Sequence, residues 1–408
     1  MKKEKATLRV LHLFGDMRAF KIGLWQSNHG MEVHQIIMKD PSVYENLYKG
    51  KIYVHQSRFS TRIYNKIKSR QFMKVFKPFL ILYPLYISLL AKIVKKNKIE
   101  IIHAHRHTGA IVAFLSKKMY NLNNVKIIFD YQDPWSGEDL EKKNLFQRLA
   151  LKIYFKLEEY IIKNSSITIA QGEEQIELLS KRYLIGKERF NYTLNTTPHK
   201  EFSQVIDKRI KEKYKLEEKN VLYLGSIIDY FGVHLIPPAA KEIIKKYPRI
   251  KFVILGVVRD EQYWEKILNY IKKNNLEKNF VIITNPLSQE EIKKIISLCD
   301  IGLITHMKGS KICEVAIPTK LFEYLSCGLV VLSSELNHIT KFILPTKCGI
   351  SFEPGNSKDI VKKLNLLLSN NTEMKKMKKN ARKIVEGRYN WDRDMERMME
   401  SYYKILSS

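Results

Sequence analysis

The 408-residue chain has few cysteines, glycines and prolines, and no apolar run long enough to cross a membrane. Its four cysteines are widely spaced and form no C-x-x-C pair, which argues against a zinc site or a disulfide framework and suits a reduced compartment. Twelve prolines and seventeen glycines are too few for a fibrous or low-complexity chain. The first apolar run, residues 8–14, is too short for a signal peptide, so we interpret it as a β-strand.

Acidic residues are also scarce. The chain has 42 Asp and Glu against 71 Lys and Arg, a formal net charge of +29. An excess of this size predicts a polyanionic neighbour, which could be nucleic acid, an anionic membrane or a phosphorylated substrate. Helix-turn-helix, RNA-recognition and finger signatures are all missing, so nucleic acid is the weakest of the three and we expect none.

The positive charge is concentrated in residues 51–98, which contain twelve Lys and Arg and no acid. Inside this stretch, residues 78–91 are uncharged and rich in aromatic residues, with Pro84 in the middle. Fourteen residues fall short of the roughly 20 that a spanning helix requires. Two interpretations remain: a surface that docks on anionic lipid, or a core helix whose ends are basic.

Short runs rich in Val, Ile and Leu alternate with helical patterns along the chain. The predicted strands are residues 8–14, 31–38, 99–105, 125–133, 165–170 and 191–195 in the first half, and residues 221–225, 251–256, 280–284, 301–305 and 329–334 in the second. Strands that alternate with helices require crossover connections and therefore parallel, doubly wound sheets.

This pattern predicts an α/β fold with two Rossmann-like domains that face a central cleft. We place one domain at residues 1–200 and the other at residues 201–385. Residues 386–408 are expected to form a closing helix that packs back on the N-terminal domain.

Ligands of such sheets bind beyond the carboxyl ends of the strands. The segment with the most informative pattern is residues 308–334, where a helix is predicted to begin at Pro318 and to end before Gly328. The amino end of that helix suits a phosphate group, and Lys320, one turn in, adds a full positive charge. Glu323 follows three residues later and could accept hydrogen bonds from a ribose diol.

The stretch PTKLFEYLSCGLVVL closely resembles the nucleotide-sugar-binding segment of the large family of retaining glycosyltransferases with the GT-B fold, the family 4 type. Further stretches resemble the same family, among them VLYLGSIIDYFG, LSQEEIKKIISLCDIGLIT, HGMEVHQIIM, IEIIHAH, SSITIAQGEEQIELL and YNWDRDMERMMESYYKIL. The resemblance implies transfer of a sugar from a nucleotide diphosphate to an acceptor hydroxyl, with retention of configuration and without a metal. The Asp-Pro-Trp at 133–135 resembles the subgroup that acts on lipid-linked saccharides.

The resemblance also implies that residues 1–200 form the acceptor domain and residues 201–385 the nucleotide-sugar donor domain, and it implies roles for individual residues. Asp133 would be an acceptor base or a sugar-hydroxyl contact, although a strand-end cap is equally compatible with its position, and Glu314 is a second catalytic candidate. Expected donor-binding residues are Glu323, Lys320, Thr319, Leu321, Gly15, Gly225 and Thr284, and expected cleft residues are His105, Lys308 and Lys311.

Three positions depart from the family pattern. The first Glu of its paired motif should fall at Val315, and Glu314 could replace it only if the loop shifts by one residue. Ser226 and Phe231 stand where many relatives carry a basic pair that holds the pyrophosphate. These departures keep open a catalytically weakened scaffold or binding subunit of a glycan-assembly complex, whereas the match around Glu323 argues against a nucleotide-sugar epimerase.

His103, His105 and His107 alternate and would share one face of a strand, but no carboxylate or cysteine cluster nearby completes a metal site, so we expect none. No cofactor is expected either, because the nucleotide sugar is a substrate. The expected partners are a nucleotide-diphosphate sugar, a glycan or lipid-linked acceptor and an anionic membrane surface. The expected role is cell-surface polysaccharide or glycoconjugate synthesis, in the cytoplasm and peripheral on the inner face of the membrane.

Overall fold

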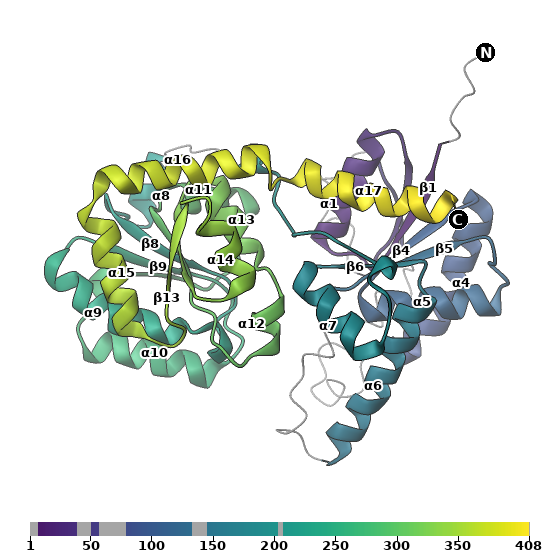
Figure 1. Cartoon of the computed structure of the whole chain (residues 1–408), viewed down its shortest axis with the longest axis horizontal. Coiled ribbons are helices and arrows are strands. Elements are labelled where there is room, and N and C mark those ends of the chain that lie inside the picture. Colours follow the sequence, from purple (N-terminus) through teal and green to yellow (C-terminus); the bar gives the residue numbers. More distant parts are fainter. Residues whose placement is uncertain (1–6, 39–49, 57–78, 133–144, 203–206, 408) are drawn as a thin grey trace. The chain divides into compact units, whose positions relative to one another are not determined.

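The computed structural model describes residues 7–38, 50–56, 79–132, 145–202 and 207–407. The chain divides into two units, each with its own parallel sheet (Figure 1). Unit 1 comprises Met1–Thr193 with Met395–Ser408, and unit 2 comprises Leu194–Asp394. The division therefore falls a few residues before position 200, and most of the last helix, α17 (Trp391–Ser407), belongs to unit 1.

Unit 1 contains a seven-stranded sheet in the order β3-β2-β1-β4-β5-β6-β7, in which every pair is parallel. The strands are β1 (Arg9–Leu13), β2 (Glu32–Ile36), β3 (Tyr53–His55), β4 (Ile101–His105), β5 (Lys126–Asp130), β6 (Ile167–Ala170) and β7 (Phe190–Tyr192). Its helices are α1 (Met17–Asn28), α4 (Phe79–Asn97), α5 (Arg106–Met119), α6 (Leu145–Asn164) and α7 (Glu173–Tyr183), besides α17. The strand order reverses between β1 and β4, so the ligand-binding position of this unit lies at their carboxyl ends.

Helix α4 bears on the two interpretations of the basic stretch. The side chains of this helix are described from residue 84 onward. Tyr86 and Leu90 are buried in the core of unit 1. The basic side chains near the end of the helix, Lys92, Lys95 and Lys96, are exposed. This arrangement supports a core helix with basic ends for residues 84–97, while residues 57–78 lie outside the described part. Among the described helices, none has the length and apolar character that a membrane span needs.

Unit 2 contains a six-stranded parallel sheet in the order β10-β9-β8-β11-β12-β13. The strands are β8 (Asn220–Leu224), β9 (Lys251–Leu255), β10 (Phe280–Ile283), β11 (Ile301–Ile304), β12 (Val330–Ser334) and β13 (Gly349–Phe352). The helices are α8 (Lys208–Lys213), α9 (Ile236–Lys246), α10 (Glu261–Lys273), α11 (Gln289–Ser297), α12 (Lys311–Val315), α13 (Thr319–Ser326), α14 (Asn337–Ile343), α15 (Ser357–Ser369) and α16 (Asn371–Gly387). The strand order reverses between β8 and β11.

Helices cover both faces of the unit 2 sheet (Figure 1). Apolar residues of α9, α10 and α15 form one core with alternate strand residues such as Tyr223 and Leu303. On the other face, α13 lies directly on β11, where a Cβ atom at Gly302 would come within 2.3 Å of the Tyr324 ring. Glycine at this position therefore allows the close approach of α13 to the sheet.

The predicted fold class is confirmed: both units are α/β with parallel sheets, and each predicted strand is present within a few residues of its predicted bounds. Two short edge strands, β3 and β13, were not predicted. Each is only three or four residues long and pairs with one neighbour, β3 with β2 and β13 with β12.

Candidate functional site

The loops after β8 and β11 form the centre of the candidate site in unit 2. Gly225 follows β8 with a φ of +134°, and its N–H donates to the Leu255 carbonyl at 3.0 Å. A Cβ atom at Gly256 would lie only 1.7 Å from the Gly225 carbonyl oxygen. These contacts keep the carboxyl ends of β8 and β9 close together. Glycine at position 225 also leaves room for Lys320, because an added Cβ atom would lie 2.9 Å from its Nζ atom.

Tyr324 fixes the position of α13 over this edge. Its hydroxyl accepts a hydrogen bond from the Leu224 backbone N–H at 2.8 Å, at the end of β8. Since Tyr324 lies one turn after Lys320, this contact also determines where the Lys320 side chain enters the site. The predicted helix is confirmed, with Pro318 as the residue before its first turn and Gly328 at a φ of +71° after its last.

Lys320 is the most unusual residue of this edge. Its side chain is 7% exposed, and its Nζ atom has no hydrogen-bond partner among the described residues. The Nζ atom lies 4.4 Å from the centroid of the Tyr223 ring and 5.2 Å from that of Phe231. Burial lowers the pKa of Lys320 to about 8. A buried ammonium group held only by aromatic rings is costly, and an anionic ligand would satisfy it.

The other residues predicted on α13 have different surroundings. Thr319 is exposed at the amino end of the helix, where no side chain caps the backbone N–H groups. Leu321 is fully buried, and its N–H donates to the Pro318 carbonyl at 3.0 Å. Glu323 is partly buried, and its charge acts on Lys320. The site therefore has a basic group, an acidic group and an uncapped helix end within two turns.

The loop before α13 places the remaining unit 2 candidates. Lys308 is exposed, and Lys311 begins α12 with a side chain outside the described part. Glu314 is exposed and accepts a hydrogen bond from the Gly309 N–H at 2.8 Å, so its carboxylate is engaged within its own loop. Thr284 is partly buried just after β10, at the same edge of the sheet as Gly225.

Sequence reasoning missed His306, which lies two residues after β11. Its ring is 3% exposed, stacks on Phe231 at 4.8 Å, and has both nitrogens without a hydrogen-bond partner in the described structure. Burial and the neighbouring Lys320 hold the pKa of His306 well below its ordinary value. The signal in the sequence was a polar residue directly after a predicted strand.

In unit 1, a buried histidine cluster lies at the carboxyl ends of β1 and β4. The Nδ1 atom of His12 is 2.9 Å from Nε2 of His105, and the other nitrogen of His12 is 2.7 Å from Oε1 of Gln26. Gly15 follows β1 beside them, where an added Cβ would lie 3.4 Å from the His105 ring. The structure thus brings together Gly15 and His105, which were predicted separately.

Asp130 at the end of β5 organises this cluster. Its carboxylate accepts hydrogen bonds from Arg18 and from Nδ1 of His105, the latter at 2.9 Å. Burial opposes its ionisation, but Arg18 and the two histidines His103 and His105 outweigh that effect, so the pKa of Asp130 is well below its usual range. The cluster therefore contains a buried, ionised carboxylate, which sequence reasoning did not single out.

The predicted face shared by His103, His105 and His107 is wrong in one respect. The strand ends at His105, and Arg106, with a φ of +61°, begins α5, so His107 turns away to bond Glu158 at 2.8 Å.

The ligand nitrogens of His12, His103 and His105 lie within 4.8 Å of one another. However, the His103 and His105 rings are stacked at 4.5 Å with 10° between their planes. Lone pairs of parallel rings do not converge on one ion, so this geometry suits hydrogen bonding better than metal binding. The candidate base Asp133 lies outside the described residues.

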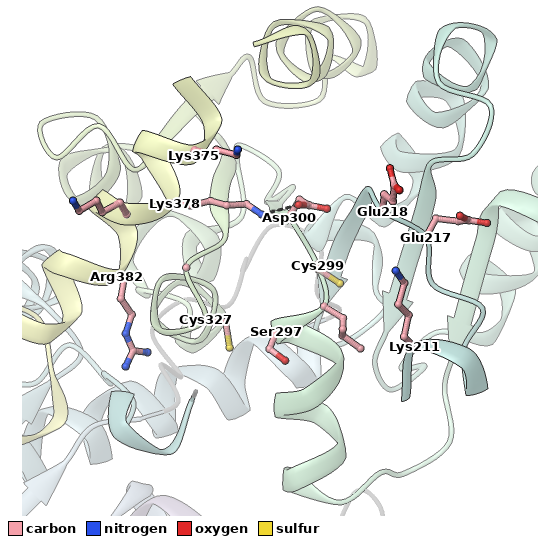
Figure 2. A pocket seen from close by; sticks show the side chains of 13 residues that line it. Lys211, Glu217, Glu218, Ser297, Cys299, Asp300, Cys327, Lys375, Lys378 and Arg382 are labelled. Atoms are coloured by element: carbon pink, nitrogen blue, oxygen red, sulfur yellow. Dashed lines mark hydrogen bonds and ion pairs between the residues drawn. The ribbon is translucent and has the colours of Figure 1, made fainter. Parts of the chain in front are cut away.

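A separate hollow of about 710 Å³ lies at the opposite, amino edge of the unit 2 strands. Figure 2 shows Lys378 of α16 directed at Asp300, which precedes β11, and the two groups are 2.6 Å apart. Arg382 is held by Glu386 at 2.7 Å and by backbone carbonyls. Since two of its cations are engaged and ligands of such sheets bind at the carboxyl edge, we do not place the site here.

Residues 205–384 match the family model of the glycosyl transferases group 1. The matched region lies within unit 2 and includes Gly225, His306, Lys320 and Glu323. Among curated proteins, the chain is 22% identical over 222 residues to the putative teichuronic acid biosynthesis glycosyltransferase TuaH of Bacillus subtilis, covering 54% of this chain and 53% of that protein. It is 21% identical over 203 residues to the uncharacterized glycosyltransferase MJ1069 of Methanocaldococcus jannaschii, covering 49% of each. The matches thus span about half the length of these relatives.

Solved structures match over nearly the whole chain. A glycosyltransferase from Rickettsia africae has a TM-score of 0.75 at 16% identity, covering 98% of this chain and 99% of that one. HepE from Anabaena in complex with UDP and glucose has a TM-score of 0.72 at 12% identity, covering 97% and 100%. These neighbours identify the fold as GT-B. The solved structures thus share the fold of the whole chain, whereas the family match is confined to unit 2.

Proposed function

We propose that this protein is a glycosyltransferase that moves a sugar from a nucleotide-diphosphate sugar to a hydroxyl of a glycan or lipid-linked saccharide. The observation that carries the proposal is Lys320, a buried ammonium group without a hydrogen-bond partner at the carboxyl edge of the unit 2 sheet. Support also comes from the family match over the same residues. HepE of Anabaena, a structural neighbour, has been crystallised with UDP-glucose.

In this proposal the diphosphate lies between Lys320 and the amino end of α13. Negative charge develops on the departing diphosphate, and preorganised positive charge in a buried site stabilises it. The Lys320 ammonium group and the uncapped backbone N–H groups of α13 supply that stabilisation. Because these groups provide the charge, the step requires no metal on the diphosphate.

Glu323 is proposed to accept hydrogen bonds from the ribose hydroxyls, since it lies three residues after Lys320 on α13 and is partly buried. In unit 1, the buried Asp130 and Arg18 would keep His105 in one orientation beside Gly15, where we place the acceptor side of the reaction. Retention of anomeric configuration and the roles of Asp133 and Glu314 remain parts of the proposal that rest on the family resemblance.

Calorimetric titration with UDP, GDP and their sugar derivatives tests the donor site. We expect wild-type protein to bind one nucleotide series and Lys320→Met to bind it at least 10-fold more weakly. Lys362→Met serves as a matched control, because Lys362 is an exposed lysine on α15 of the same unit. Equal binding by wild type and Lys320→Met would contradict the site, and absence of binding to every nucleotide would contradict the function.

A second candidate is a binding subunit or scaffold of a glycan-assembly complex with little catalysis. It is favoured by Glu314, whose carboxylate is exposed and engaged with Gly309 rather than directed at a ligand, and by the aromatic Phe231 beside Lys320. Sugar release from the bound donor separates the two: a protein that binds the nucleotide sugar without transfer or hydrolysis would be the scaffold.

The proposed setting is the synthesis of cell-surface polysaccharide or glycoconjugate at the inner face of the membrane, with the protein bound peripherally. The basic side chains Lys92, Lys95 and Lys96 are exposed on α4 and could contact lipid phosphates. Co-sedimentation with vesicles tests this setting. We expect stronger pelleting with anionic than with neutral lipid, and equal pelleting would refute it.

A further inference from the structure

His306 is a buried imidazole whose hydrogen-bonding groups are all unused within the described structure. Its ring is 3% exposed, and neither Nδ1 nor Nε2 has a partner. Buried polar side chains in native proteins are nearly always hydrogen-bonded, so an exception calls for an explanation such as an absent ligand. A histidine that served only as core filling would have been replaceable by an apolar residue at no cost.

The fold, rather than any hydrogen bond of its own, holds the His306 ring. The ring stacks on Phe231 with centroids 4.8 Å apart and 23° between the planes. The loops that carry the two residues are tied together, because the Thr305 hydroxyl donates to the Phe231 carbonyl at 2.6 Å and the Met307 N–H donates to the Tyr230 carbonyl at 2.9 Å. The ring is thus fixed in place, although neither of its nitrogens has a hydrogen-bond partner among the described residues.

His306 belongs to the same edge as Lys320. Both side chains contact the Phe231 ring. The strand that precedes Phe231, β8, and the strand that precedes His306, β11, pair from Ile301 to Leu303. Three buried nitrogens without partners therefore gather around one aromatic ring: the two of His306 and Nζ of Lys320. A ligand that satisfies all three must be compact and must offer several oxygen atoms.

The charge state of His306 restricts the ligand further. Burial of the ring disfavours its protonated form. The positive charges that face the ring, on Lys320 and on His338 when it is protonated, disfavour that form further. A neutral imidazole has one donor and one acceptor nitrogen in either tautomer. Its ligand must therefore present an acceptor oxygen and a hydroxyl donor close together. The phosphate oxygen and the adjacent sugar hydroxyls of a nucleotide sugar meet that requirement, whereas a free phosphate dianion offers acceptors alone.

We propose that His306 is a donor-positioning residue that bridges the diphosphate and the sugar. One ring nitrogen donates its N–H to a phosphate oxygen, and the other accepts a hydrogen bond from a hydroxyl of the transferred sugar. This inference rests on the proposed function and adds a residue that selects the complete sugar nucleotide over the bare nucleoside diphosphate. Lys320 supplies charge, and His306 supplies orientation.

The test is calorimetric titration of the full-length wild type and of His306→Leu with uridine, UDP and UDP-glucose, repeated with guanosine, GDP and GDP-mannose. We expect His306→Leu to bind the nucleoside as wild type does, the diphosphate about 5-fold more weakly, and the sugar nucleotide at least 20-fold more weakly. His306→Gln, whose amide retains a donor and an acceptor, should recover part of the sugar-nucleotide affinity. Met307→Leu is the control for the same loop and should match wild type.

The thermal midpoint provides a readout without ligand. His306→Leu should melt at a higher temperature than wild type, because it removes two unpartnered polar atoms from the interior. Equal affinity of wild type and His306→Leu for the sugar nucleotide would overturn the inference and leave the proposed function standing. Failure of wild type to bind any nucleotide in either series would overturn the proposed function and this inference with it.

Discussion

Replacement of Lys320 by methionine should stabilise the ligand-free protein while it weakens nucleotide binding at the donor site. The pKa of Lys320 falls from the ordinary 10.5 to about 8 because the amine is buried. Each pKa unit corresponds to about 1.4 kcal/mol, so the charged amine costs about 3 kcal/mol in the folded protein at pH 7. The contacts of Nζ with the Tyr223 and Phe231 rings offset about 1 kcal/mol of that cost. Methionine has a similar length without the charge, and Lys320→Met should therefore raise the free energy of unfolding by about 2 kcal/mol.

The pH dependence follows from the direction of the shift. Because the pKa of Lys320 is lower in the folded than in the unfolded protein, the folded protein releases its proton first as the pH rises. The destabilisation is complete below about pH 8 and disappears as the pH approaches 10.5. The advantage of Lys320→Met over wild type should therefore shrink across that window.

Urea unfolding at pH 7 and pH 9.5, with Lys362→Met as the exposed control, measures both effects. Addition of the nucleotide at about 100 times its wild-type Kd should stabilise wild type by about 2.7 kcal/mol and Lys320→Met by about 1.4 kcal/mol or less. The reasoning is refuted if Lys320→Met unfolds at the same or a lower urea concentration than wild type at pH 7 while the control behaves normally.

Three further predictions concern other parts of the two units. Glu323→Ala should weaken UDP binding about 10-fold but leave the affinity for 2′,3′-dideoxy-UDP unchanged; equal losses for both ligands would argue against a ribose contact. Gly302→Val should lower the free energy of unfolding by about 2 kcal/mol or more and weaken donor binding, since a Cβ there would lie 2.3 Å from the Tyr324 ring on α13. Wild-type donor affinity in a Gly302→Val protein that urea unfolding shows to be destabilised would contradict the link between this glycine and the donor site. Asp130→Asn should cost about 3–5 kcal/mol, because it leaves the partly buried Arg18 without its carboxylate partner. The pKa of Asp130 is lowered on folding, so wild type should exceed Asp130→Asn in free energy of unfolding by the whole amount above about pH 4. This difference should shrink as the pH falls below about 4, as measured by urea unfolding from pH 3 to pH 7.

Much of the fold could be predicted because strands buried on both faces are continuous apolar runs. The runs VLYL and VVLSS lie in β8 and β12 within a residue or two of their predicted bounds. The edge strands β3 and β13 escaped prediction because three or four residues are too few to show a strand pattern without the pairing partner. The predicted helix around Lys320 was correct because its ends are marked locally: Pro318 has no N–H to donate to a preceding helical turn, and Gly328 takes a positive φ that few other residues favour.

Less of the candidate site than of the fold could be predicted from the sequence. Lys320 was identified as a basic residue near a helix end, but its burial against Tyr223 depends on β8 lying beside β11, some 80 residues apart in the chain. His306 carried no motif, and its free nitrogens become significant only once the ring is buried on Phe231.

In unit 1, His12, His105 and Asp130 meet because three parallel strands end at the same edge, although more than 110 residues separate the first from the last. Local sequence thus determined which segments are strands and helices and where the helix of the donor segment begins and ends, because those properties depend on neighbouring residues and on apolar periodicity. Strand order, and with it the burial and pairing of the charged side chains, was decided only by the tertiary structure, because hydrogen bonding and desolvation act between atoms that the chain brings together from distant positions.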